Sequence, residues 1–271
     1  MMSPTATTRI SGLFETCRSE GRKAFIAYIT GGDPSPDLTP ALVRALEKGG
    51  ADLIELGVPF SDPIADGPVI QRASDRALRA HTTLPRLLAI VRTIREMSQI
   101  PILLFSYLNP LLKYGFERLA RDAAESGVDG VLLTDLCIEE ASAPVRDLRR
   151  FGLDTVFLAA PTSSEHRLRL VAEHSSGFIY LVSRTGVTGE QATLSGSVEP
   201  LIARMRRLTD LPLAVGFGIS TPAQVGEVAA LADGVVVGSA LVKFIENNSA
   251  APNAADRLET FTRSLTAPLR P

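Results

Sequence analysis

One acidic side chain stands inside an apolar run, where its chemistry must differ from that of a surface carboxylate. Glu55 lies in the run Leu53-Ile-Glu-Leu56, which has the composition of a buried strand. Removal from water raises the pKa of a carboxyl group. A carboxyl that titrates near the working pH can both donate and accept protons, so Glu55 is a candidate general acid and base. The structural alternative is a buried glutamate paired with an arginine.

The segment after Glu55 carries two more carboxylates, Asp62 and Asp66, in a connection that is long for the step from a strand to a helix. Prolines at positions 59, 63 and 68 stiffen this connection. Asp66 precedes Gly67, and taken alone it fits best as an aspartate that shapes a turn. Beside a buried Glu55, it becomes a candidate second carboxylate for acid/base chemistry.

Glycine-rich segments in the last third of the chain could bind an anion. They are residues 183–189, 216–220 and 238–240, and the last one leads directly into a helical stretch at 241–246. Glycine lets backbone N–H groups approach an anion closely, and a helix N-terminus attracts negative charge. The alternative is that all three segments are only tight turns. Gly216-Phe-Gly218 is not a dinucleotide fingerprint, because it lacks the third glycine.

The elements that must position these residues alternate regularly. Short apolar runs predict eight strands, at residues 25–29, 52–56, 102–105, 130–133, 155–158, 178–182, 213–215 and 234–237. Amphipathic stretches predict helices at 37–48, 84–97, 116–126, 139–151, 164–174, 198–208 and 222–231, with further helices at 8–20 and 255–265. We therefore expect an α/β fold, a (β/α)8 TIM barrel with an extra N-terminal helix, as a single domain over residues 1–271. A doubly wound open sheet is the alternative.

Two other types of reaction are disfavoured because the residues that they require are missing from the expected barrel mouth. The lysines Lys23, Lys48, Lys113 and Lys243 fall away from the carboxyl ends of the expected strands, which disfavours a Schiff base. His81, His166 and His174 fall in expected helices or loops away from the barrel mouth, and Cys17 and Cys137 are far apart, so we expect no metal site. Carboxylate acid/base chemistry on a phosphorylated substrate remains.

The overall charge and the N-terminal sequence indicate which partners and which cellular location to expect. The net charge is −2, with both signs mixed along the chain, so no nucleic-acid or membrane surface is expected. The first residues lack the apolar core of a signal peptide, and no apolar run is long enough to span a bilayer. We expect a cytoplasmic protein.

Six segments of the chain resemble the tryptophan synthase alpha chain family. The longest is Leu53-Ile-Glu-Leu-Gly-Val-Pro-Phe-Ser-Asp-Pro-Ile-Ala-Asp-Gly-Pro-Val-Ile-Gln71. The others are Tyr28-Ile-Thr-Gly-Gly-Asp-Pro34, Tyr107-Leu-Asn-Pro110, Ser183-Arg-Thr-Gly-Val-Thr-Gly189, Gly216-Phe-Gly-Ile-Ser220 and Gly238-Ser-Ala240. The likeness covers essentially the whole chain in order. It implies a lyase of tryptophan biosynthesis that cleaves indole-3-glycerol phosphate to indole and glyceraldehyde 3-phosphate without a cofactor of its own.

The resemblance also implies roles for individual residues. Glu55 would handle protons at the indole C3 and the C3′ hydroxyl, and Asp66 would accept a hydrogen bond from the indole N–H. Gly189, Gly218, Gly238 and Ser239 would hold the phosphate. Tyr28, Tyr107 and Phe217 would line the indole slot, while Tyr180 and Thr188 would position Glu55 and the closing loop. A lid over the site would be the loop 184–193.

The resemblance implies a partner as well. A beta chain, which would carry pyridoxal phosphate, would form an alpha2-beta2 assembly with this chain through the loops around Asp62 and from Asp135 to Glu140. Cys137 replaces the proline of the family's Asp-x-Pro-x-Glu-Glu pattern, and His81 stands where glycine is common. Two alternatives stay open: a lyase that works alone and releases indole for secondary metabolism, and a silent alpha-like subunit that only activates a beta chain.

Overall fold

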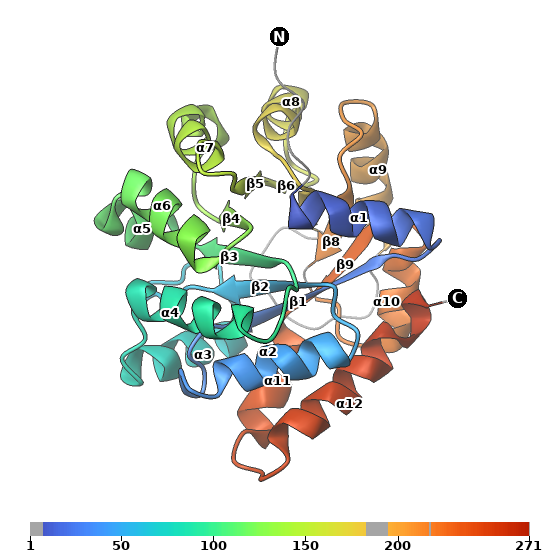
Figure 1. The fold of residues 1–271 in the computed structure, drawn as a ribbon. Coiled ribbons are helices and arrows are strands. Elements are labelled where there is room, and N and C mark those ends of the chain that lie inside the picture. The colour runs from blue at the N-terminus through green and yellow to red at the C-terminus, as the bar shows by residue number, and fades with distance from the viewer. Residues whose placement is uncertain (1–7, 183–194, 217, 271) are drawn as a thin grey trace.

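Parallel strands form a ring at the centre of the molecule (Figure 1). The structure is a computed structural model, and it describes residues 8–182, 195–216 and 218–270. Within these ranges the strands are β1 (Ala24–Thr30), β2 (Leu53–Gly57), β3 (Ile102–Ser106), β4 (Gly130–Leu133), β5 (Asp154–Val156), β6 (Leu158–Ala159), β7 (Ile179–Val182), β8 (Leu213–Gly216) and β9 (Gly234–Val237). Their order in the sheet is β5-β4-β3-β2-β1-β9-β8-β7-β6, and every pairing is parallel.

The barrel closes through one short run of chain. The single strand expected at 155–158 is divided at Phe157 into β5, which pairs with β4, and β6, which pairs with β7. These two strands stand at opposite ends of the sheet order, although they are consecutive in the chain. The sheet is therefore a nearly closed barrel with eight strand positions, and the expected TIM-barrel fold class is confirmed.

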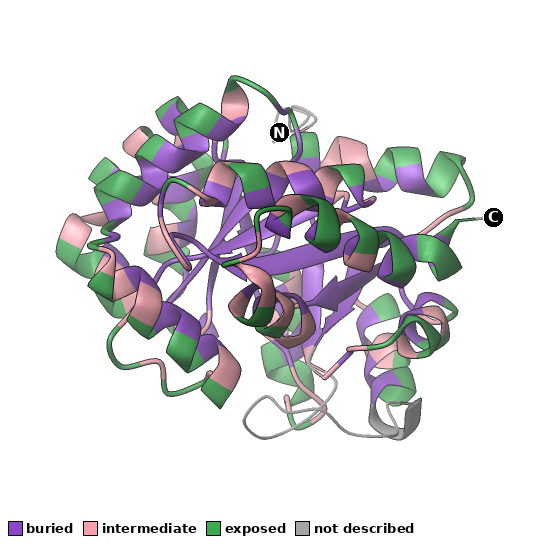
Figure 2. Ribbon diagram, turned by 90° about the horizontal axis from the view of Figure 1, so that it is seen from below, coloured by how far each residue is buried: buried purple, intermediate pink, exposed green. Residues whose placement is uncertain are grey.

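Helices surround the ring, and their outer faces are exposed while the strands are buried (Figure 2). They are α1 (Arg9–Ser19), α2 (Thr39–Lys48), α3 (Pro68–Arg79), α4 (Leu84–Arg95), α5 (Leu108–Tyr114), α6 (Phe116–Ser126), α7 (Ser142–Arg149), α8 (Glu165–His174), α9 (Ser195–Arg206), α10 (Pro222–Ala229), α11 (Ser239–Asn248) and α12 (Ala254–Thr266), with short 3₁₀ turns η1 (Ile138–Glu140) and η2 (Ala267–Leu269). No helix in the described ranges is both long and apolar enough to cross a membrane.

Two of these helices were not expected from the sequence. α3 begins at Pro68, so the connection after β2 is shorter than the run of prolines and carboxylates suggested. Proline is favoured in the first turn of a helix, and it served here as a helix start instead of a loop stiffener. α5 is a short helix that carries Asn109 and Pro110. Each helix follows a candidate site residue: α3 begins two residues after Asp66, and α5 begins directly after Tyr107.

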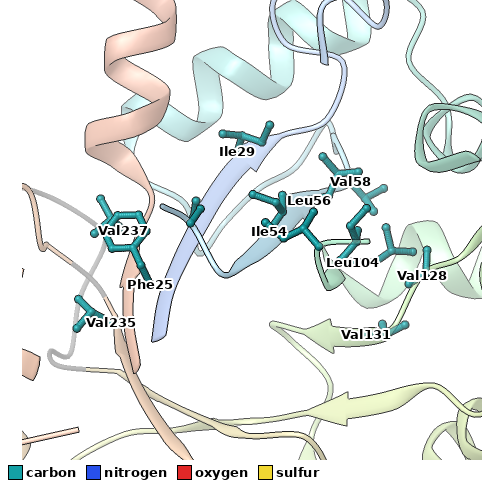
Figure 3. Packing of buried hydrophobic residues seen from close by; sticks show 14 of the residues in the cluster. Phe25, Ile29, Ile54, Leu56, Val58, Leu104, Val128, Val131, Val235 and Val237 are labelled. Carbon is teal, nitrogen blue, oxygen red and sulfur yellow. The ribbon is translucent and has the colours of Figure 1, made fainter. Parts of the chain in front are cut away.

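Strand alternation separates two layers of the core. Phe25, Ile29 and Leu56 point outward and pack with Leu104 and Val237 in the layer between strands and helices (Figure 3). Residues at the alternate positions of the strands point into the barrel and pack in a second buried cluster. That cluster includes Ile26, Tyr28, Leu53, Leu103, Phe105, Leu132, Val156, Phe178, Tyr180, Ala214 and Val236. The period of two along each strand thus decides which side chains can reach a site inside the barrel.

The amino-terminal end of the barrel is closed by α1. Ile10, Phe14 and Cys17 of this helix are buried, and the ring centroid of Phe14 lies 5.6 Å from that of Phe178. The expected N-terminal helix therefore covers the end of the barrel opposite to the mouth. It leaves the carboxyl ends of the strands accessible.

Aspartates repeat at this closed end with a common geometry. Each one precedes a strand, and its carboxylate accepts a hydrogen bond from the first backbone N–H groups of an adjacent strand. The pairs are Asp52 with Phe25 at 2.8 Å, Asp129 with Ile102 at 2.7 Å and Asp233 with Leu213 at 2.8 Å. Asp129 is only 4% exposed and also pairs with Arg95 and Arg9, at 2.7 and 2.8 Å. These contacts give backbone N–H groups at the strand starts a carboxylate acceptor.

We predict that Asp129→Ala lowers the free energy of unfolding by about 3 kcal/mol, because it leaves a nearly buried Arg95 without its carboxylate. Urea unfolding of the two proteins measures the difference. Glu259→Gln is the control, since its pair with Arg263 is exposed and should contribute less than about 0.5 kcal/mol. Equal small losses in both variants would contradict a stabilising role for the aspartate contacts.

Candidate active site

A cavity opens at the carboxyl ends of the strands, inside the barrel mouth. In TIM barrels, this is the end at which active sites occur. The described residues that line the cavity come from six strands or the segments that follow them. They are Tyr28, Glu55, Asp66, Ile70, Phe105, Tyr180, Gly218, Ile219, Val236, Gly238 and Ser239.

Glu55 is the most buried charge-bearing group of this cavity. Its side chain points inward from β2, pairs in register with Tyr28 of β1, and is 1% exposed. Among the described residues, neither of its carboxylate oxygens has a hydrogen-bond partner. Burial alone raises its pKa to about 8. The arginine partner of the structural alternative is not found within the described ranges, so Glu55 is a protonated acid near neutral pH.

Asp66 lines the same cavity from the connection between β2 and α3. Partial burial raises its pKa to about 6, and a hydrogen bond from the Tyr107 hydroxyl opposes this rise. The same hydroxyl accepts a hydrogen bond from the backbone N–H of Ala65, at 2.9 Å. The cavity thus contains two carboxyl groups in different environments: Glu55 holds its proton at neutral pH, while Asp66 has mostly lost its own.

Tyr107 is buried, at 3% exposed, and it supports Asp66 from outside the cavity wall. Its ring lies against Phe60, with centroids 5.3 Å apart. The backbone N–H of the next residue, Leu108, donates to Asp135 at 2.6 Å. Tyr107 and its neighbour therefore join the connection after β2 to the loop after β4.

The walls of the cavity are largely apolar. Tyr28 packs edge-on against Phe105, with ring centroids 5.2 Å apart. Phe105, Ile70, Ile219 and Val236 were not singled out from the sequence, yet all four line the cavity. Strand alternation could have found two of them, since Phe105 and Val236 have the same inward parity as Glu55 and Tyr28. A flat aromatic group fits between such walls.

The start of α11 contributes to the lining of the same cavity. Gly238 precedes the first residue of α11, Ser239, and both line the cavity. Gly218 also lines it and has a φ of +83°, a conformation that favours glycine. The unpaired backbone N–H groups at the start of α11 attract negative charge. Thr188, Gly189, Phe217 and the expected lid 184–193 lie outside the described residues.

Comparison with known proteins gives the family. A sequence model of the tryptophan synthase alpha chain family matches residues 14–269. The chain belongs to this family. It is 61% identical over 258 residues to the tryptophan synthase alpha chain of Solibacter usitatus, covering 95% of this chain and 97% of that protein. It is 52% identical over 258 residues to that of Geobacter sulfurreducens, with the same coverage.

Solved structures of the tryptophan synthase alpha chain family agree in fold. The structure of Mycobacterium tuberculosis tryptophan synthase superposes with a TM-score of 0.88 at 37% identity, covering 98% of this chain and 99% of that chain. The tryptophan synthase subunit alpha of Legionella pneumophila gives 0.87 at 38% identity, covering 97% and 99%. The expected family and the expected lyase activity are confirmed.

The two departures from the family pattern keep the backbone that the usual residue would give. His81 has a φ of +58°, in the left-handed region that glycine adopts most readily. Cys137 has a φ of −62°, within the range that a proline ring imposes. The loop after β4 thus follows a path that proline could also adopt. The thiol of Cys137 is exposed and lies 3.3 Å from a carboxylate oxygen of Glu139.

We predict that Gly57→Ala lowers the lyase rate about tenfold or more, because a methyl group there would overlap the Tyr28 hydroxyl and push the ring into the cavity. Adding Tyr28→Phe removes the closest atom and should restore part of the rate. Steady-state kinetics of both variants measure this. Gly226→Ala is the control, because its nearest neighbour is an ordinary contact of 3.5 Å.

Similar rates for Gly57→Ala and Gly226→Ala would contradict this account of the cavity wall. So would a double variant that is no faster than Gly57→Ala alone.

Proposed function

We propose that the protein cleaves indole-3-glycerol phosphate to indole and glyceraldehyde 3-phosphate, with Glu55 and Asp66 as its two catalytic carboxyl groups. The observation that carries the proposal is the buried Glu55 carboxyl, which lacks a hydrogen-bond partner among the described residues and is protonated near neutral pH. A retro-aldol cleavage needs a proton donor at the carbon that leaves and a base at the hydroxyl that becomes a carbonyl. One carboxyl between these two atoms can serve both needs.

The reaction then runs in two proton transfers. Glu55 donates its proton to C3 of the indole ring, and the ring nitrogen takes up positive charge that the Asp66 carboxylate stabilises by accepting the N–H hydrogen bond. The Glu55 carboxylate next removes the proton of the C3′ hydroxyl. The C3–C3′ bond breaks, its electron pair returns to the ring, and the hydroxyl carbon becomes the aldehyde. Glu55 ends protonated, as it began.

The other residues of the cavity would hold the substrate. The start of α11, with Gly238 and Ser239, and the backbone at Gly218 suit the phosphate, and Tyr28 and Phe105 suit the indole ring. Tyr180, also in the wall, would orient Glu55 from the opposite side. Tyr107 would act through Asp66 instead of touching the ring. Thr188, Gly189 and Phe217 keep the roles expected from the sequence.

We propose that the cleavage needs no cofactor in this chain. Among the described residues, the cavity lining contains two carboxyl groups and no lysine, and no cluster of three or more histidine, cysteine or acidic side chains suited to a metal ion is found. Pyridoxal phosphate would belong to a partner beta chain. The single-domain organisation over residues 1–271 and the cytoplasmic location stay predictions.

A tryptophan synthase beta chain is the proposed partner, bound in an alpha2-beta2 assembly through the loops around Asp62 and from Asp135 to Glu140. Two large apolar side chains support this surface: Ile64 is 79% exposed and Leu112 of α5 is 55% exposed. Exposed apolar side chains of this size mark contact surfaces when they gather near a site. The hydrogen bonds of Asp135, Leu108 and Tyr107 connect this surface to Asp66.

The comparisons favour this reading over both alternatives, a lyase that works alone and a silent subunit. The relatives at 61% and 52% identity are named tryptophan synthase alpha chains. Cys137 keeps a backbone that proline could adopt, which removes the structural reason for expecting altered coupling at this loop. Glu55 and Asp66 both line one cavity, as an active lyase requires.

We predict that Glu55→Gln abolishes indole release, because an amide can neither donate the proton to C3 nor remove the hydroxyl proton. The same variant should be more stable than the wild type by on the order of 4 kcal/mol at pH 8. The folded-state pKa of Glu55, about 8, lies above its unfolded value near 4.5, so the wild type loses stability as pH rises between these values. Indole release and urea unfolding at pH 5 and pH 8 measure both effects.

Glu259→Gln serves as the matched control, since it makes the same change at an exposed helical pair. Retention of most of the activity by Glu55→Gln would reject its assigned role. A stability difference that does not grow from pH 5 to pH 8 would contradict the buried, protonated carboxyl.

We also predict that a tryptophan synthase beta chain raises the rate of indole release, and that Ile64→Lys reduces this activation about tenfold without changing the rate of the isolated protein. A charge placed in the centre of an apolar contact opposes association. Met97→Lys is the control, because Met97 is 46% exposed but follows α4, outside the proposed surface. Full activation of the Ile64→Lys variant would remove the connection after β2 from the interface.

A further inference from the structure

An ion-pair network lies behind the active site and joins three elements that build it. Arg76 of α3 donates to both carboxylate oxygens of Asp33, from Nε at 2.7 Å and from Nη2 at 2.9 Å. Its third nitrogen, Nη1, donates to Glu246 of α11 at 2.6 Å. Arg72, one turn earlier on α3, donates twice to the same glutamate, at 2.8 Å each. Asp33 follows β1.

Each of the joined elements supplies a different part of the site. α3 begins two residues after Asp66, and its Ile70 lines the cavity. α11 begins at Ser239, the proposed phosphate-binding end. β1 carries Tyr28 in the proposed indole wall. The network thus spans the outside of the site from its carboxylate end to its anion end.

Arg76 is the centre of the network. Its side chain is 27% exposed, and its partners Asp33 and Glu246 are 3% and 21% exposed. Ion pairs that are shielded from water are screened less by salt than exposed ones. The planar guanidinium reaches both carboxylates at once, which a lysine ammonium with its single nitrogen cannot do in the same geometry. Arg72 is 52% exposed, so its contribution should be smaller.

We infer that Arg76 is a positioning residue that fixes the spacing between the carboxylate end and the phosphate end of the active site. This inference rests on the proposed function, which assigns the indole to one end and the phosphate to the other. A substrate whose two halves are joined gains affinity only when both subsites stand at the matching distance. Loosening the spacing leaves each subsite intact, but the joined molecule can no longer satisfy both.

The test compares a joined ligand with its fragments. The probes are 3-(indol-3-yl)propyl phosphate, which lacks the cleavable hydroxyl, and the separate fragments indole and glycerol 3-phosphate. Calorimetric titration of Arg76→Gln should show the joined ligand weakened about tenfold or more, with each fragment within about twofold of wild type. The KM for indole-3-glycerol phosphate should rise more than kcat falls.

The variants form a graded series. Arg76→Lys should not restore tight binding of the joined ligand, since one ammonium cannot hold both carboxylates. Glu246→Gln, which loosens only the tie to α11, should give an intermediate loss and supports the test if Arg76→Gln folds poorly. Arg72→Gln should change the affinity less than about threefold. Arg44→Gln, in a partly buried pair with Glu47 within α2, is the matched control.

Distinct outcomes overturn the inference. Wild-type affinity for the joined ligand in both Arg76→Gln and Glu246→Gln would reject it. Equal weakening of the fragments and the joined ligand would show general damage to the subsites, and would also reject it. If the wild-type protein itself does not cleave indole-3-glycerol phosphate, the proposed function fails, and this result is separate because it needs no variant.

Discussion

The burial of one carboxyl group without a compensating charge is the constraint on which the rest of the structure depends. At neutral pH Glu55 rests inside the barrel mainly as a neutral acid, and its burial opposes folding at any pH where the unfolded chain would ionise it. The surroundings must therefore be stable without its help. The two layers of apolar side chains, the α1 helix at the closed end and the aspartates that hold the strand starts supply that stability.

Stability and chemistry are consequently separated along the barrel axis. At the amino ends of the strands, buried aspartates meet arginines and backbone N–H groups, and Asp129 has three such partners. At the carboxyl ends, Glu55 has none among the described residues, and Asp66 has one tyrosine hydroxyl. Carboxyl groups are therefore paired with positive charges and N–H groups at one end of the barrel. At the other end they have few partners, and this leaves them able to exchange protons.

Much of the site could be predicted from the sequence because its signals are local. Glu55 lies inside an apolar run, and Gly238 lies just before a helix. The residues next to each of them in the sequence are enough to identify it as a candidate. Tyr107 was expected at the site from the family resemblance, but its contact with Asp66 was not, because that contact joins segments that only the closed barrel brings together. The link between Arg76 and Glu246 is hidden for the same reason, since the two residues are 170 positions apart. α3 was missed because its first proline was also a reasonable loop residue.

The division of the fifth strand position at Phe157 has a mechanical consequence. The barrel consists of two arcs, β1 to β5 and β6 to β9, that meet at a hydrogen-bonded ladder between β1 and β9 and at an unbroken covalent backbone through Phe157. A slip of one residue at the ladder would exchange inward and outward side chains, and the backbone cannot slip at all. Glu55 and Asp66 belong to one arc, and Gly218, Gly238 and Ser239 belong to the other. The ring of strands therefore fixes the spacing between these two sets of residues. Entry and exit of molecules must then depend on the segments that connect the strands to the helices.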